Sequence, residues 1–146
     1  MKNIAPKIFF VLLLALLWYF QQYHDHSSNK TSSQTFDEQK VQQYFKQKQS
    51  GKMVKIQAVV TKILSDDIHE PRHQRFIVGL SNKHTVLITH NIDLAPRVTG
   101  LNEGDQLEIT GQYEWNPQGG VIHWTHHDPN GLRQGGKIIH KGEVYQ

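Results

Sequence analysis

The chain has 146 residues, enough for one modest domain and an additional segment. It contains no cysteine, which excludes disulfide scaffolds, cysteine-ligated zinc sites and lipid attachment through cysteine. The formal net charge is +3 and the pI is about 9.1, a balance that often accompanies nucleic-acid binding. Residues 50–146, however, carry ten Lys or Arg against ten Asp or Glu. The basic excess therefore lies in the first 49 residues, and it does not favour nucleic acid as a partner of the folded part.

The first 23 residues have the organisation of an export signal. Two lysines precede the unbroken apolar run IFFVLLLALLWYF, residues 8–20. These 13 residues would span only about 20 Å as a helix, which is short for a membrane core and favours a cleaved signal peptide. No A-x-A-like cleavage motif follows the run, and aromatic residues lie at its far end. These two features favour an uncleaved signal anchor over residues 4–23.

Both alternatives predict export, because lysines on the N-terminal side keep that end in the cytoplasm. As an anchor, residues 4–23 would cross a bacterial inner membrane once and leave the domain in the periplasm. After cleavage, the domain would be a soluble periplasmic or secreted protein. Residues 24–35 (HDHSSNKTSSQT) are polar and rich in Ser and Thr, which predicts a flexible linker.

A short amphipathic helix is predicted over residues 36–49 (FDEQKVQQYFKQKQ). Val41, Tyr44 and Phe45 fall near helical spacing, and two acidic residues lie at the start of the segment, where they suit a helix N-terminus. This helix should lead directly into the domain that follows.

From residue 50 onward, the apolar residues follow the alternation that is typical of β-strands. Five strands are predicted near residues 53–64, 76–80, 86–90, 107–113 and 121–125, with a last hairpin over 137–145. Asp93 suits a helix N-cap and Pro96 a first turn, so residues 94–101 are expected to form a short helix or a loop. Gly111 would suit a bulge in the fourth strand.

These elements predict a mostly β domain over residues 50–146. Five strands with a short helix or loop between the third and the fourth match the order of an OB-like barrel. The hydrophobic helix and the amphipathic helix would precede this barrel, and the hairpin would follow it. An SH3-like barrel or a small sandwich would give much the same sequence pattern.

Histidine is the main chemical signal, because eight of the ten histidines lie in residues 50–146. The densest group is VIHWTHHDP, residues 121–129. If this segment is one extended strand, His123 and His127 share one face, while Trp124 and His126 share the other. Pro129 cannot continue a strand ladder, so the last histidines should lie on a rim of the barrel.

A metal site is one interpretation of this group. Imidazole and carboxylate groups bind divalent metals such as zinc, and three ligands leave a position open for water. The candidate ligands are His90, His123, His127 and Asp128, with His73 and His126 in reserve. The spacing matches no known zinc motif such as HEXXH. In the alternative interpretation, each histidine is a strand residue that is hydrogen-bonded to a neighbour.

A binding surface for a ligand is a second interpretation. Arginine can form bidentate hydrogen bonds with an anion, and an exposed indole can stack on a sugar or a base. The candidate ligand-binding residues are Arg75, Arg97, Trp115, Trp124 and His126. Ion pairs with nearby acids would account equally well for the arginines, and core packing would account for the tryptophans.

Three motifs resemble those of a family of small bacterial envelope proteins that is catalogued as a domain of unknown function. The motifs are HQRF (residues 73–76), HNIDLAPR (residues 90–97) and HWTHHDP (residues 123–129). The resemblance covers about residues 50–146 and implies a leader followed by a small β-domain, but no reaction. Lys137 stands where a tryptophan is expected after the glycine pair, which argues against a stacking role for this tail.

Two classes of function follow from these observations. The favoured one is a non-catalytic binding module at the membrane, which uses a His/Arg/Trp rim for a small anionic ligand, a glycan, a metal or an envelope protein. The alternative is a metal-dependent hydrolase of the phosphoesterase or nuclease type, with a His/Asp metal site. No cofactor is certain, although a divalent metal such as zinc would fit the second class.

Overall fold

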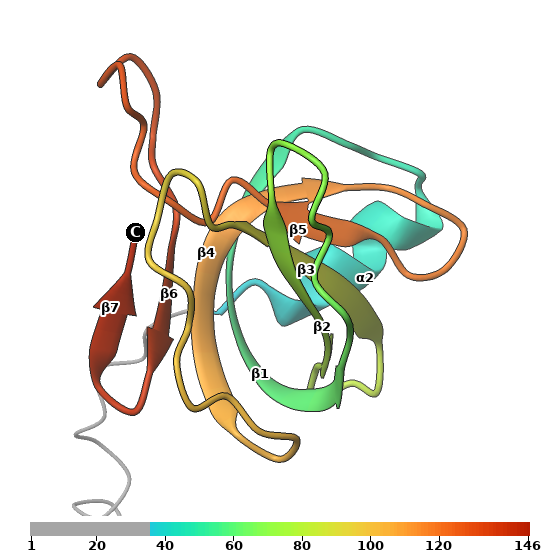
Figure 1. Ribbon diagram of the computed structural model, residues 1–146. Coiled ribbons are helices and arrows are strands. Elements are labelled where there is room, and N and C mark those ends of the chain that lie inside the picture. The colour runs from blue at the N-terminus through green and yellow to red at the C-terminus, as the bar shows by residue number, and fades with distance from the viewer. Residues whose placement is uncertain (1–35) are drawn as a thin grey trace, which may run out of the picture. The chain divides into compact units, whose positions relative to one another are not determined.

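Five strands close into a barrel in the computed structural model, which describes residues 36–146 (Figure 1). The barrel strands are β1 (Lys52–Ile63), β2 (His73–Gly79), β3 (Thr85–Asn91), β4 (Gln106–Glu114) and β5 (Val121–His123). Their order is β1-β2-β3-β5-β4, and an antiparallel pairing between β1 and β4 closes the ring. Only β3 and β5 run parallel among these pairs. This is the order of an OB-like barrel, and it confirms the predicted fold.

The predicted C-terminal hairpin is also present, and it extends the sheet beside β4. It consists of β6 (Lys137–His140) and β7 (Glu143–Tyr145). One edge of β4 pairs with β1 throughout. The other edge pairs with β6 over residues 107–110 and with β5 over residues 112–114. Strands β1, β4 and β6 therefore lie side by side and share one outer surface (Figure 1).

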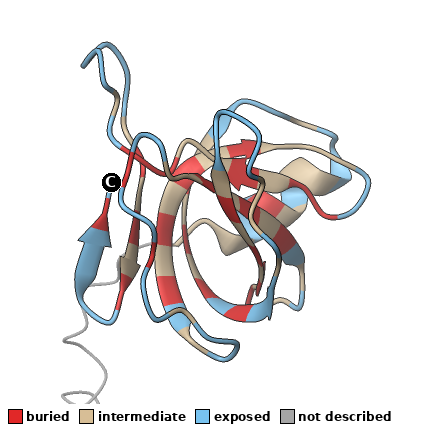
Figure 2. Cartoon of the chain, viewed as in Figure 1, coloured by how far each residue is buried: buried red, intermediate tan, exposed pale blue. Residues whose placement is uncertain are grey.

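The core follows from the two-residue period of the strands. Inward-facing residues of β2, β3 and β4 are buried, and the residues between them are only partly buried (Figure 2). Phe76, Ile88 and Ile109 are completely buried. Burying each such side chain contributes about 1.5–3 kcal/mol relative to leaving it in water. Because the barrel is closed, this core forms without a second layer of structure.

Helix α2 (Glu38–Lys46) is shorter than the predicted 36–49 and packs against the barrel. Val41 is completely buried in the barrel core. The ring of Phe45 lies 4.9 Å from that of His84, in the turn between β2 and β3. Asp37, just before the helix, covers the edge of β1, because its backbone N–H donates to Lys55 O and its carboxylate accepts from Lys55 N. The helix is therefore an integral part of the barrel domain.

The predicted signal segment (residues 1–23) and linker (residues 24–35) lie outside the described residues. Among residues 36–146, no helix combines the length and the hydrophobicity that a membrane span needs.

The connection between β3 and β4 is a loop of turns rather than a helix, so the second of the two predicted alternatives is correct. The proposed N-cap role of Asp93 is wrong. Asn91 Oδ1 accepts hydrogen bonds from the backbone N–H groups of Asp93 and Leu94. The Asp93 carboxylate accepts instead from the backbone and the guanidinium of Arg72, at 2.7 Å in each case. This tertiary contact joins the loop to the start of β2, which no local sequence pattern indicates.

Two further local predictions are wrong. Gly111 lies in an unbroken register with β1, so it forms no bulge there. The glycine is needed because a Cβ at this position would lie 2.7 Å from the Ile122 side chain. Strand β5 ends at His123, because Trp124 adopts a left-handed backbone with φ of 53°. The predicted alternation of side chains over residues 123–127 therefore stops at Trp124.

Candidate functional site: a basic pocket beside strand β4

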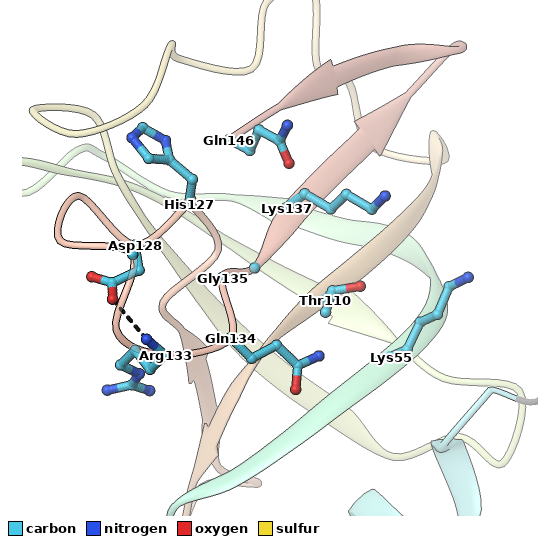
Figure 3. Close-up of a pocket in the computed structure, with 11 residues that line it drawn as sticks. Lys55, Thr110, His127, Asp128, Arg133, Gln134, Gly135, Lys137 and Gln146 are labelled. Atoms are coloured by element: carbon cyan, nitrogen blue, oxygen red, sulfur yellow. Dashed lines mark hydrogen bonds between the residues drawn. The ribbon is translucent and has the colours of Figure 1, made fainter.

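A polar pocket of about 540 Å³ lies on the outer surface shared by β1, β4 and β6 (Figure 3). Its floor contains Lys55, Thr110 and Lys137, one residue from each strand. The connection between β5 and β6 forms its wall; we call residues 126–136 the pocket loop. The remaining lining residues are His127, Asp128, Gly131, Arg133, Gln134, Gly135, Gly136 and Gln146.

The three floor residues form one cross-strand row. Lys55 is in register with Thr110, and Thr110 is in register with Lys137. Neighbouring strands are about 4.8 Å apart, so the two lysine Cα atoms are about 10 Å apart. The long side chains of both lysines can therefore reach one bound group. Figure 3 shows Thr110 between the two lysines, whose ammonium groups point toward the same side of the pocket.

The two lysines differ in their partners. Lys55 Nζ lies 3.8 Å from Glu108 Oε2 and 5.4 Å from the centre of the Phe36 ring. Lys137 is partly buried, yet within residues 36–146 its ammonium group has neither an ion pair nor a hydrogen bond. An ammonium group without a protein counter-ion can pair with an anionic ligand. The positive charge of the pocket floor therefore favours an anionic ligand.

The pocket loop is held in shape by Asp128. Its carboxylate accepts hydrogen bonds from the backbone N–H groups of Asn130, Leu132 and Arg133, at 3.2, 2.6 and 2.9 Å. Burial works to raise the pKa of Asp128, but these donors outweigh it and hold the pKa below its ordinary value. Asp128 was predicted to ligate a metal, whereas its oxygens are occupied in closing the loop.

The Trp124 side chain packs against the pocket loop and holds it in place. Its Nε1 donates to the Gln134 carbonyl oxygen at 3.0 Å. The Arg133 guanidinium lies 4.0 Å from the indole centre, and the His126 ring lies at 4.6 Å. A cation and a second ring thus already pack on the indole, and Arg133 also donates to the Gln112 side chain. Trp124 therefore shapes the loop wall, and its predicted role as a ligand-stacking platform has no support in these contacts.

The two ends of the pocket loop cross at Gly136. Its backbone N–H donates to the His126 carbonyl oxygen at 2.7 Å. A Cβ on Gly136 would collide with the carbonyl oxygens of Trp124 and Thr110 and would lie 2.9 Å from Thr125 Cα. Glycine is therefore required here for space, so that the chain can return from the loop and enter β6 beside β4.

His90 is buried beneath this crossing and does not reach the pocket. Its Nε2 lies 2.9 Å from the Pro96 carbonyl oxygen, which can only accept, so Nε2 carries the proton. Its Nδ1 then accepts from the Thr125 hydroxyl at 2.8 Å. Burial lowers the pKa of His90 below its ordinary value, and the charges of His126 and His73 lower it further, although the Pro96 contact opposes them. Both ring nitrogens are thus committed within the protein.

The other three histidines of the predicted sites are dispersed. His126 is buried, and its Nδ1 lies 2.7 Å from the His127 carbonyl oxygen. His127 is exposed and lines the pocket. His123 Nε2 is buried without a hydrogen bond, 3.6 Å from Glu114 Oε1. In the described part of the chain, no three His, Asp or Glu side chains are grouped so that they could hold a metal ion. The predicted ligands His90, His123, His127 and Asp128 therefore do not converge.

The remaining predicted ligand-binding residues make structural contacts away from the pocket. Arg75 donates through Nε to the Ser65 carbonyl oxygen at 2.9 Å. Arg97 forms an ion pair with Asp66 and so joins the β3–β4 loop to the β1–β2 loop. Trp115 packs against the hydrophobic core, and Lys48 Nζ lies 5.5 Å from its ring centre.

No local pattern in the sequence distinguishes the lysines of the pocket floor. Lys55 and Lys137 are 82 positions apart, and each alternates with apolar residues like any outward-facing strand residue. Only the register of β1, β4 and β6 brings them together. The one signal in the sequence was Lys137 itself, which replaces the expected tryptophan after the glycine pair.

Comparisons with known proteins agree with the motif resemblance. No curated protein and no solved structure matches the chain significantly. A family model described as a protein of unknown function (DUF3465) matches residues 26–146, which include the whole barrel, helix α2 and the pocket loop. Because this match covers most of the chain, the protein belongs to the DUF3465 family.

Proposed function

We propose that the domain is a non-catalytic binding module that takes an anionic ligand in the basic pocket. The observation that carries this proposal is the row formed by Lys55, Thr110 and Lys137, in which Lys137 has no counter-ion among residues 36–146. Two ammonium groups and a hydroxyl suit a phosphate, sulfate or carboxylate group. Gln134, at the edge of the pocket, offers an amide that can donate to the same group.

The charge of the other lining residues supports the same conclusion. Arg133 adds a third cation to the lining of the pocket. The one carboxylate side chain among the lining residues belongs to Asp128, and the amides of the pocket loop already satisfy it. A hydrolase that depends on a His/Asp metal site has no comparable support, because its predicted ligands lie apart.

We further propose that the domain works on the outer side of a bacterial inner membrane. The export signal carries this part of the proposal, with residues 4–23 as a membrane anchor. In that location, the pocket would meet envelope glycans, lipid headgroups and free anions rather than nucleic acid. Fractionation of cells that express the full chain, with protease access to the domain as the readout, tests this placement. Protection of the domain in spheroplasts would contradict it.

Replacement of Lys137 tests the binding site. We expect Lys137→Gln to weaken binding of D-gluconate and of inorganic phosphate about fivefold, because one charge-assisted contact of a partly buried lysine contributes about 1 kcal/mol. Titration calorimetry on the full-length protein measures this change. Lys62→Gln, which removes an exposed lysine of β1 outside the pocket, is the matched control. Equal affinities for the wild type and Lys137→Gln would show that the anion binds elsewhere, and no binding of either anion would contradict the proposal.

A further inference from the structure

The outer surface of β1 and β4 continues from the pocket toward the opposite end of the barrel. A second hollow of about 350 Å³ includes Gln57, Gln106 and Glu108, and a third of about 330 Å³ shares Gln57 and Gln106 with it. Gln57 is in register with Glu108, two positions along from the row of Lys55 and Thr110. The three hollows therefore follow one another along the same strands. We call this surface the β1–β4 face.

The side chains of this face favour a partner rich in hydroxyl groups. A glutamine amide both donates and accepts hydrogen bonds, as does a sugar hydroxyl, whereas a phosphodiester chain offers only acceptors. Gln57 and Gln106 lie on the face itself, and Gln134 lies in the pocket. Within residues 36–146, no aromatic ring lines the second or the third hollow. Single-stranded nucleic acid, which stacks its bases on aromatic rings, therefore fits this face poorly.

Charge is distributed unevenly along the face. The cations of the pocket lie at one end, where Lys55 and Lys137 flank Thr110. Beyond the pocket, Glu108 lines the second hollow together with Lys141, whose ammonium group is already paired with Asp105 at 3.2 Å, and Glu38 lines the third. A ligand that carries an acidic group on every unit would place charges beside these two carboxylates. A ligand with one acidic group at its end would avoid that repulsion.

We propose that the ligand is an oligosaccharide with a single acidic group at one end. The acidic group occupies the basic pocket, and the uncharged rings lie along the β1–β4 face as far as Gln57 and Gln106. This inference rests on the proposed function of the pocket and adds the class of ligand and its direction. From Lys55 to Val59, the face extends about 13 Å, which is longer than a single sugar ring. Affinity should therefore rise with chain length.

Maltooligosaccharides oxidised to aldonic acids at the reducing end provide suitable probes, because each carries one carboxylate and a neutral chain. We expect titration of the full-length protein, in a detergent without a sugar headgroup, to show at least tenfold tighter binding of the four-unit acid, in which three rings follow the opened terminal unit, than of gluconate. The neutral four-unit sugar should bind at least fivefold more weakly than its acid.

Two sets of variants separate the pocket from the face. The double variant Gln57→Ala/Gln106→Ala should weaken binding of the four-unit acid about tenfold, since two hydrogen bonds are lost, and should leave gluconate binding unchanged. Lys137→Gln should weaken both ligands. Gln118→Ala is the matched control, because this glutamine lines a different hollow, beside β2 and β3. If Gln118→Ala instead weakened binding of the acidic oligosaccharide, the inference would be wrong, because the sugar rings would then lie on that other surface.

The remaining outcomes are equally decisive. Gluconate binding that depends on Lys137, without a rise in affinity with the length of the sugar chain, would contradict the oligosaccharide proposal. The proposed anion site in the pocket would then remain supported. If gluconate does not bind at all, the proposed function itself fails. Tighter binding of an oligogalacturonate of equal length, or of single-stranded DNA, would overturn the assignment of one acidic group on a neutral chain.

Discussion

Gly136→Ala is expected to destabilise the domain by about 3 kcal/mol or more, which corresponds to a fall in Tm of roughly 10 °C or more. The added methyl group would meet the backbone carbonyls of Trp124 and Thr110, and backbone atoms cannot move aside as a flexible side chain can. Relief of the clash requires Gly136 to move away from both carbonyls, which also strains its hydrogen bond to His126 O. Thermal unfolding of the full-length protein, followed by tryptophan fluorescence, measures the change.

Gly131→Ala is the matched control for this prediction, because Gly131 lies in the same pocket loop. A Cβ on Gly131 would have no atom within 4 Å, and its φ of +64° is the only obstacle. We expect this variant to lose about 1–2 kcal/mol, the cost of a left-handed backbone for alanine. If Gly136→Ala were no less stable than Gly131→Ala, the close approach of Gly136 to the Trp124 and Thr110 carbonyls would be contradicted.

His90→Gln is expected to lower the stability of the protein by about 2 kcal/mol near pH 7.5, and this difference should shrink in acid. The variant leaves Thr125 and the Pro96 carbonyl imperfectly paired inside the barrel, where an unsatisfied polar group costs about 1–3 kcal/mol. Melting temperatures of both proteins from pH 8 to pH 5 measure the difference. Carboxyl groups with lowered pKa values remain ionised over this range, so they do not obscure it.

The pH dependence follows from the lowered pKa of His90 in the folded protein. As the pH falls through about 6.5, the unfolded chain takes up a proton at this histidine while the folded protein does not. Protonation then favours unfolding, so the contribution of His90 is complete above that pH and declines below it. The variant lacks this titration and should lose less stability in acid.

His69→Gln is the control, because His69 is an exposed residue of the β1–β2 loop. The melting temperature of the His69→Gln variant should equal that of the wild type at every pH. A constant difference between the wild type and His90→Gln from pH 8 to pH 5 would contradict the assignment of His90 as a buried neutral side chain.

The local conformation was largely predictable from the sequence. Alternating apolar residues indicated five strands and the last hairpin, and their order indicated an OB-like barrel, because one face of each strand must be buried. Prediction failed where tertiary contacts set the backbone. Strand β5 ends where Trp124 adopts a left-handed backbone and its indole contacts Arg133 and His126. Asp93 binds Arg72 rather than capping a helix.

The chemistry of the site was less predictable than the fold. The cluster of histidines and motifs predicted a functional unit over residues 123–129. Its members, however, mainly build the pocket loop: Asp128 closes it, Trp124 supports it, and Thr125 is fixed by His90. A pattern of histidine and aspartate cannot show whether these groups face a ligand or one another, because that depends on the path of the chain after β5.

The sequence by itself determined the class of the domain, the strand order and the charge balance of its folded part, because these depend on residue type and two-residue periodicity. Only the tertiary structure decided where a ligand can be held. Lys55 and Lys137 belong to strands that are far apart in the sequence, and they meet because both strands pair with β4 at Thr110. Cross-strand register sets distances of a few ångströms between residues far apart in the chain, and no local pattern carries that information.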